Sequence, residues 1–167
     1  FSSAEIKNIQ EEVMGIEIEK KFLLKSDEWR GKTKGIVCRQ GYISSTVEHT
    51  VRIRTMDDKG ILTIKGPGSG SIRPEFEYQI PFEDARTLLD TLCSHPLIEK
   101  VRYKIPFQGF TWEVDEFFGL NEGLIIAEIE LESVNQHFDL PDWVGKEVTG
   151  DPKYFNTQLQ RTPFSKW

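Results

Sequence analysis

Charged and apolar side chains alternate along several stretches of this sequence, and this alternation limits the folds that the chain can adopt. Successive side chains of a β-strand point to opposite faces, so residues 17–23 place Glu17, Glu19 and Lys21 on one face and mainly apolar residues on the other. The same pattern recurs in residues 51–54, 64–65, 73–78, 100–103, 112–115 and 128–132. We therefore expect strands that present one face made almost wholly of charge.

Length and composition favour a single domain with a sizeable core. The chain has 167 residues and a net charge of −6, which argues against non-specific binding to nucleic acid or to an anionic membrane. No apolar run reaches transmembrane length, and no signal peptide is recognisable. Cys38 and Cys93 have neither metal-ligand spacing nor a disulfide framework. We therefore expect a cytoplasmic protein without a nucleic-acid or membrane partner.

The order of the expected elements indicates a mainly β protein of the α+β class, with antiparallel strands and accessory helices. Residues 1–15 are expected to be an N-terminal helical extension, with its helix at 2–14, and residues 16–167 to be the main domain. The apolar residues of 82–94 follow helical spacing and predict a further helix. Asp151 and Pro152 predict another helix start in the tail.

Two architectures would bury the apolar faces of these strands. In a sandwich, the apolar faces form a central core and the charged faces point to solvent. In a closed barrel of inverted polarity, charge lines the lumen and apolar side chains lie outside under helices or loops. Two features favour the barrel: positive and negative residues are segregated by strand, and the helix at 82–94 needs an apolar surface to cover.

The barrel makes specific predictions about exposure and about the ligand. It predicts shielded charges at Arg52, Arg54, Lys65 and Glu77. It predicts apolar side chains outside the barrel at Ile18, Phe76 and Val114. Because burying unpaired charge is costly, such a lumen must hold a ligand or a dense network of ion pairs. Inward Arg and Lys residues suit a compact polyphosphate, and inward carboxylates suit Mg²⁺ or Mn²⁺.

The stretch Glu17-Ile18-Glu19-Lys20-Lys21 matches the E-x-E-x-K signature of the CYTH family, the triphosphate tunnel metalloenzymes. The resemblance holds in order and spacing from about residue 16 to the end. It includes residues 51–54, 62–66, 73–77, 100–103, 112–115 and 127–131. Residues 148–156 resemble the bacterial branch, in which inorganic triphosphatases are the most similar members, although such sequences are often labelled adenylate cyclases.

The resemblance implies an eight-stranded antiparallel closed β-barrel, a triphosphate tunnel that uses Mg²⁺ or Mn²⁺ as cofactor. It implies metal ligands at Glu17, Glu19, Glu128 and Glu130. It implies that the small-molecule triphosphate substrate is bound by Lys21, Arg52, Arg54, Lys65, Arg73, Lys100, Arg102 and Lys153. The candidate catalytic residues are Lys21, Tyr42, Lys100, Glu75, Glu77 and Asp115. We also consider a homodimer.

Three functions remain open at this point. The first is hydrolysis of inorganic triphosphate, the second is an adenylate cyclase that converts ATP to cyclic AMP and pyrophosphate, and the third is a non-catalytic module that binds polyphosphate or nucleotide. The carboxylates argue against the third, because a pure anion binder gains nothing from them. The inward positions offer almost no apolar slot for adenine, which favours the first. Tyr42 and Lys153 also have structural interpretations, as a packing aromatic residue and as a solvated lysine.

Overall fold

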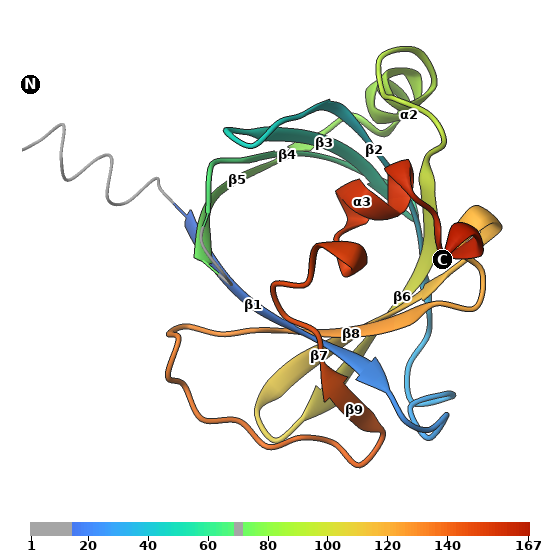
Figure 1. Ribbon diagram of the computed structural model, residues 1–167. Coiled ribbons are helices and arrows are strands. Elements are labelled where there is room, and N and C mark those ends of the chain that lie inside the picture. Colours follow the sequence, from blue (N-terminus) through green and yellow to red (C-terminus); the bar gives the residue numbers. More distant parts are fainter. Residues whose placement is uncertain (1–14, 69–71) are drawn as a thin grey trace, which may run out of the picture.

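The computed structural model describes residues 15–68 and 72–167, and these form a closed antiparallel β-barrel of eight strands with a short ninth strand beside it (Figure 1). The strands are β1 (Gly15–Leu24), β2 (Ile36–Ser45), β3 (Thr50–Met56), β4 (Lys59–Lys65), β5 (Ile72–Ile80), β6 (Ile98–Phe107), β7 (Phe110–Phe117), β8 (Ile125–Glu130) and β9 (Val144–Glu147). The helices are α2 (Phe82–Thr91) and α3 (Asn156–Arg161), with 3₁₀ turns η1 (Gly119–Asn121), η2 (Pro152–Tyr154) and η3 (Phe164–Lys166). The helix expected at residues 2–14 lies outside the described residues.

Strand β1 closes the barrel because it pairs along both edges. The order around the barrel is β1–β5–β4–β3–β2–β6–β7–β8 and back to β1. Residues 19–23 of β1 pair with β8, and residues 15–18 pair with β5. Phe22 and Leu24 also pair with β9, a strand that the sequence analysis did not predict. The closed barrel expected from the sequence is confirmed, and closure gives each of its eight strands a paired neighbour on both sides.

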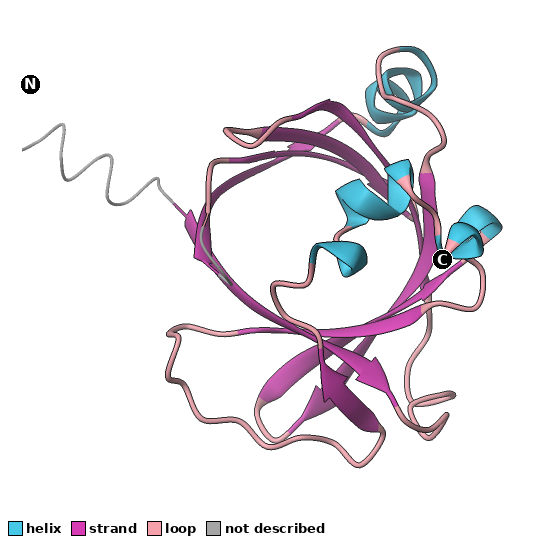
Figure 2. Cartoon of the chain, in the orientation of Figure 1, coloured by secondary structure: helices cyan, strands magenta, loops and turns pink. Residues whose placement is uncertain are grey.

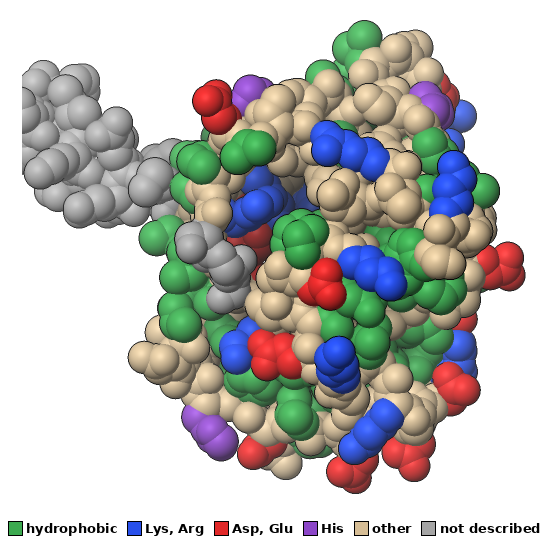
Figure 3. Space-filling view, viewed as in Figure 1, with side chains coloured by type: hydrophobic (Ala, Val, Ile, Leu, Met, Phe, Trp, Pro, Cys, Tyr) green, Lys and Arg blue, Asp and Glu red, His purple; other side chains and the backbone are tan. Residues whose placement is uncertain are grey.

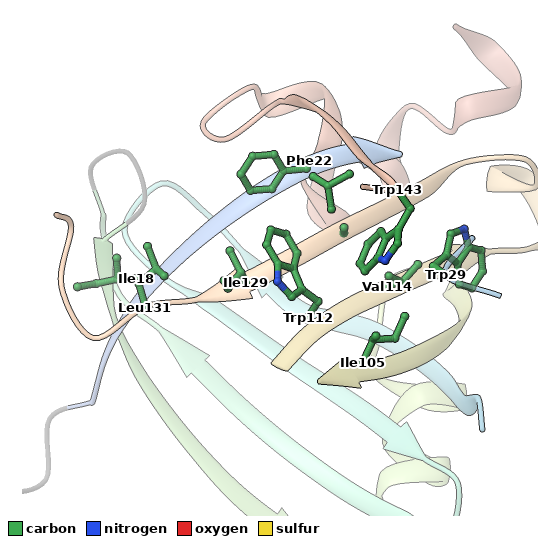
Figure 4. Packing of buried hydrophobic residues seen from close by; sticks show 11 residues of the cluster. Ile18, Phe22, Trp29, Ile105, Trp112, Val114, Ile129, Leu131 and Trp143 are labelled. Carbon is green, nitrogen blue, oxygen red and sulfur yellow. The ribbon is translucent and has the colours of Figure 1, made fainter. Parts of the chain in front are cut away.

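The apolar faces of β1, β7 and β8 point outward, where a cluster of buried side chains covers them (Figure 4). Trp112 is fully buried, and its ring centroid lies 5.9 Å from that of Trp143 and 5.5 Å from that of Phe22. Ile18 and Val114 belong to this cluster, as the barrel predicts. Trp143 comes from the chain leading into β9, so this segment supplies the outer cover of the barrel wall.

Helix α2 covers the outer face of β3 and β4, which confirms the helix predicted after Pro81. Ala85 and Leu89 are fully buried, and they pack against Ile53 of β3. Burying a Leu side chain contributes roughly 1.5–3 kcal/mol. The helix approaches β4 closely at Gly60, where a Cβ atom would lie 2.8 Å from the Cβ of Ala85. A larger residue at this position would push the helix off the strand.

Shielding of the lumen charges follows the barrel prediction with one exception. Arg52 and Arg54 are buried, and Lys65 is largely buried. Glu77 was expected to be shielded, but 51% of its side chain is exposed. It lies on the half of β5 that pairs with β4 alone, beyond the residues that pair with β1. Phe76, on the outer face of the same strand, is only half-buried, because α2 packs on β3 and β4 rather than on β5.

One end of the lumen is apolar, which the sequence analysis did not predict. Phe117 is the cross-strand partner of Lys100, and Ile126 is the partner of Asp115, so both apolar side chains point the same way as these charges. Leu159 of α3 packs on them and is fully buried. Helix α3 lies across this end of the barrel (Figures 1 and 2). The tunnel is therefore charged along part of its length and plugged by apolar side chains at one end.

Candidate active site

The lumen of the barrel contains a cavity of about 680 Å³ lined mainly by charged side chains. Figure 3 shows a hollow in which Lys, Arg, Asp and Glu side chains meet. The charged lining residues are Glu17, Glu19, Lys21, Arg52, Arg54, Lys65, Glu75, Glu77, Arg102, Lys104, Glu113, Glu128 and Glu130. The fold therefore brings most of the site residues predicted from the sequence to one cavity.

On β6 and β7, Lys100, Arg102 and Asp115 form a group that we call the β6–β7 cluster. Asp115 is fully buried, and it accepts hydrogen bonds from Lys100 Nζ at 2.5 Å and from Arg102 Nε and Nη2 at 2.7 Å each. Burial would raise the pKa of Asp115, but Arg102 and Lys100 lower it below its usual value. Burial lowers the pKa of Lys100 to about 8, although Asp115 opposes the shift. Each cation of this cluster thus has a carboxylate partner.

On β3, Arg52 and Arg54 have neutral hydrogen-bond partners, and we call them the β3 arginines. Arg52 Nη2 donates to Thr63 Oγ1 at 3.1 Å, and its nearest carboxylate oxygen, on Glu77, is 3.8 Å away. Arg54 Nε donates to Gln40 Oε1 at 3.1 Å. Burial, followed by repulsion from Arg52, lowers the pKa of Arg54 to about 10. Both arginines line the cavity, so their charge is available to an anion.

Carboxylates gather on β1 and β8, and lysines are paired with them. Lys21 Nζ pairs with Glu128 and lies 2.7 Å from Glu19 Oε1. Burial opposes the charge on Lys21, but Glu128 and Glu19 raise its pKa above the usual value. Lys65 Nζ lies 2.6 Å from Glu17 Oε2. Lys21 and Lys65 are therefore bound to the same carboxylates that the resemblance assigns to the metal ion.

The chemistry of these carboxylates fits a divalent metal ion. Glu19 and Glu130 are cross-strand partners and both line the cavity. Burial and the charge of Glu128 raise the pKa of Glu19, and burial and the charge of Glu17 raise that of Glu130. Carboxylates that repel one another in this way favour a hard cation with oxygen ligands.

In the described part of the chain, no group of three or more His, Cys, Asp or Glu is already placed to hold a metal ion. Lys21 and Lys65 each bind carboxylate oxygens that a metal would need. A metal would therefore compete with the two lysines, and a polyanion that attracts the lysines would help it.

A second cavity, of about 670 Å³, opens the same site toward α3. It shares with the first cavity Glu17, Glu19, Lys21, Lys65 and Asn156. Arg73 lines this second cavity. Helix α3 is tied to the barrel here, because Arg161 Nη2 donates to the backbone oxygen of Ser45 at 2.8 Å. Most of the predicted substrate-binding residues thus line one or both of these cavities.

Four predicted site residues line neither cavity: Tyr42, Lys100, Asp115 and Lys153. Tyr42 is buried behind Gln40, whose Nε2 donates to the Tyr42 hydroxyl at 3.2 Å, and burial raises the pKa of Tyr42. Lys100 is buried in its contact with Asp115. Lys153 was expected over the tunnel mouth, but its Nζ lies 3.9 Å from the ring centroid of Trp167. A cation–π contact therefore holds Lys153 against the C-terminal residue rather than the lumen.

Two uncharged residues that the sequence analysis did not single out belong to the site. Gln40 supports Arg54, and Asn156 lines both cavities and accepts from Lys100 Nζ at 3.4 Å. The sequence did contain a signal for Gln40. It lies two residues from Cys38 and two residues from Tyr42 on β2, so it shares a face of the strand with both. Asn156 ends the stretch 148–156 that resembles the bacterial branch, but its place at the cavity depends on how α3 packs across the barrel.

Comparison with protein families gives a match to the CYTH domain over residues 15–159, so the chain belongs to the CYTH domain family. An inorganic triphosphatase from Acetivibrio thermocellus is 53% identical over 154 residues, covering 92% of this chain and 99% of the relative. An inorganic triphosphatase from Nitrosomonas europaea is 34% identical over 148 residues, covering 86% and 95%. A crystal structure of an inorganic triphosphatase is 31% identical, with a TM-score of 0.63, and the match covers 86% of this chain and 93% of that one. The triphosphate tunnel metalloenzymes are a metal-dependent family.

Proposed function

We propose that this chain is a metal-dependent triphosphatase that hydrolyses inorganic triphosphate and releases phosphate. The observation that carries the proposal is a set of cations around one cavity. They come from β1, β3, β4 and β6, and they are Lys21, Arg52, Arg54, Lys65, Arg102 and the more exposed Lys104. A triphosphate presents negative oxygens along its whole length, so cations on several strands can contact it from several sides. Both curated relatives described above are inorganic triphosphatases.

The lining cations would bind and orient the phosphate chain, together with Arg73 in the second cavity. Water then attacks the terminal phosphorus, and the bond to the bridging oxygen breaks, which leaves phosphate and pyrophosphate. There is little covalent chemistry for the protein to do in this reaction, so positioning and electrostatic stabilisation supply most of the rate enhancement. Lys21 is the main candidate for this electrostatic stabilisation, because its ammonium group already lies between carboxylates at the cavity surface.

We assign the metal to Glu17, Glu19 and Glu130, with Glu128 beside them, and we expect Mg²⁺ or Mn²⁺ from the oxygen-only donor set. Such an ion would neutralise charge on the triphosphate and on the departing group. The chain's own contribution is to hold four carboxylates on two paired strands, at positions that face the cavity.

The remaining catalytic candidates fall into two groups. Glu75 and Glu77 line the cavity near Arg52, and we propose that they accept hydrogen bonds from the attacking water. Lys100, Asp115 and Tyr42 lie behind the cavity surface, so we propose that they act by positioning residues that touch the substrate. Lys100 and Asp115 would hold Arg102, and Tyr42 would hold Gln40.

Product identification tests the proposed function. The purified chain is incubated with inorganic triphosphate, ATP or thiamine triphosphate in the presence of Mg²⁺ or Mn²⁺, and the products are separated by chromatography. We expect phosphate and pyrophosphate from inorganic triphosphate, with a higher kcat/KM than for either organic substrate. Cyclic AMP and pyrophosphate as the main products of ATP, at a rate matching triphosphate hydrolysis, would assign the function to an adenylate cyclase. Tight binding without products would assign a binding module.

Cellular location and assembly remain predictions. Cys38 and Cys93 are buried and unpaired, which is compatible with the reducing cytoplasm that we expect. Among residues 15–68 and 72–167, no helix is long and apolar enough to cross a membrane. Sedimentation of the purified chain would decide between a monomer and a homodimer.

A further inference from the structure

Arg54 differs from the other cations that are buried in the described lumen. Arg52, Lys100 and Arg102 each have a carboxylate oxygen within 4.0 Å, and so do the less buried Lys21 and Lys65. No carboxylate of the described chain lies that close to the Arg54 guanidinium, although only 6% of the residue is exposed. A buried cation without a counter-charge is costly, so its position requires an explanation.

Gln40 supplies the contact that a carboxylate would otherwise make. It is fully buried on β2 as the cross-strand partner of Arg54, and its Oε1 accepts from Arg54 Nε. Its Nε2 donates to the hydroxyl of Tyr42. This pair of contacts orients the amide, because a guanidinium can only donate and must face the oxygen end. Tyr42 and Gln40 together hold the Arg54 side chain from behind.

A neutral acceptor has a different electrostatic effect from a carboxylate. It satisfies Nε and fixes the plane of the guanidinium, but it leaves the positive charge uncompensated. With Nε occupied, Nη1 and Nη2 remain as the paired donors that match two oxygens of a phosphate group. Arg54 lines the cavity, so this edge is accessible to a ligand there. A carboxylate at position 40 would satisfy the same donor, but it would also repel a polyanion.

We propose that Gln40 is a positioning residue that aims the uncompensated Arg54 guanidinium at a phosphate group of a condensed-phosphate substrate. The inference rests on the proposed function and deepens it, because it identifies the lumen cation that lacks a carboxylate partner and the residue that positions it. Gln40 itself does not touch the reacting atoms. Its effect passes through Arg54, and Tyr42 orients the amide that makes the contact.

The test compares two substitutions with opposite charge consequences. Gln40→Leu removes the acceptor, and we expect KM for inorganic triphosphate to rise roughly tenfold with a smaller change in kcat. Gln40→Glu keeps the acceptor and the shape but adds negative charge, so we expect a larger rise in KM that grows as the pH increases and the introduced carboxyl ionises. A purely structural role predicts the reverse order, because Gln40→Glu preserves packing. Gln40→Glu at least as active as Gln40→Leu across the pH profile would overturn the proposal.

A double-mutant cycle gives the second readout. The Gln40→Leu effect is measured in the wild type and in an Arg54→Met background, with triphosphate affinity determined by calorimetry in the absence of metal. We expect the roughly tenfold effect to disappear in the Arg54→Met background, because the interaction that Gln40 supports is already gone. An equal effect in both backgrounds would contradict the proposal. Thermal unfolding is recorded for every variant, so that a loss of fold is not mistaken for a loss of affinity.

Gln160→Leu is the matched control, because it also removes a buried amide, one that donates to the backbone oxygen of Ser94 rather than contacting Arg54. We expect it to lower stability without changing triphosphate affinity. If Arg54→Met weakens binding while Gln40→Leu does not, this inference fails and the proposed function stands. If neither the wild type nor its variants bind or hydrolyse triphosphate, the proposed function fails and the inference fails with it.

Discussion

The β6–β7 cluster and the β3 arginines are both groups of buried cations in the same lumen, but the hydrogen-bond partners of these cations differ. In the cluster, Asp115 compensates Lys100 and Arg102 within a fully buried contact. On β3, a hydroxyl and an amide hold Arg52 and Arg54, and the nearest carboxylates are at the limit of a salt bridge or beyond it.

This difference separates two uses of the same residue types. A cation paired at short range with a buried carboxylate helps to hold the barrel together, since breaking the pair would leave an uncompensated charge. A cation held by neutral groups keeps its attraction for an incoming anion. Within the β6–β7 cluster, Lys100 and Asp115 are therefore best understood as structural support for Arg102, and the β3 arginines are the part of the site that is ready to bind phosphate.

The largest expected effect is on stability, at Asp115. Asp115→Ala leaves Lys100 and Arg102 without their main counter-charge, and we expect the free energy of unfolding to fall by about 3–5 kcal/mol. Thr63→Val removes the neutral partner of Arg52 and should cost only about 1 kcal/mol. Urea denaturation of both variants measures the contrast. Equal losses at the two sites would break the distinction between the cluster and the β3 arginines.

The next effect is on turnover, at the carboxylates of β1 and β8. Glu19→Ala and Glu130→Ala each remove an oxygen ligand from the proposed metal site, and we expect kcat/KM to fall at least about 100-fold while the fold is retained. Steady-state kinetics over a metal titration checks the loss, and circular dichroism checks the fold. Metal-dependent activity at the wild-type level in both variants would contradict the assignment.

A smaller effect appears in the pH dependence of stability, through Lys100. Its pKa is lowered from 10.5 to about 8 in the folded chain, so between these pH values the unfolded chain holds a proton that the folded chain has released. Stability contributed by this residue therefore rises as the pH increases through this window. We expect the unfolding free energy of the wild type to increase relative to Lys100→Met between pH 8 and pH 10.5. A constant or falling difference would show that the Lys100 pKa is not lowered.

The smallest expected effect is at Lys153, which the sequence placed among the substrate-binding residues. Its ammonium group lies against Trp167, so we expect Lys153→Ala to change kcat/KM by less than about twofold. Lys65→Ala is the comparison, because Lys65 lines both cavities and should lose at least about tenfold. A Lys153→Ala defect as large as that of Lys65→Ala would place Lys153 at the tunnel mouth during turnover.

The barrel and most of its lining could be predicted because side-chain alternation is a local property of a strand. Arg52 and Arg54 must share a face wherever β3 lies, and the same holds for Glu17, Glu19 and Lys21 on β1. Their convergence on one cavity then follows from closure of the barrel.

The features that the sequence did not predict depend on contacts between distant segments. Strand β9 forms because residues 144–147 pair with the edge of β1. The apolar end of the lumen forms because Leu159 packs on Phe117 and Ile126. The partner of each lumen cation also depends on register. Gln40 faces Arg54 only because β2 and β3 pair as they do, and no motif marked this contact.

The most direct test of this account is a crystal structure with inorganic triphosphate bound. We predict phosphate oxygens in contact with Nη1 and Nη2 of Arg54 and with Arg52, while Lys100 and Arg102 keep their contacts with Asp115. A triphosphate bound outside the lumen would contradict the account, and so would one bound to a displaced Lys100 and Arg102 with Arg54 uninvolved.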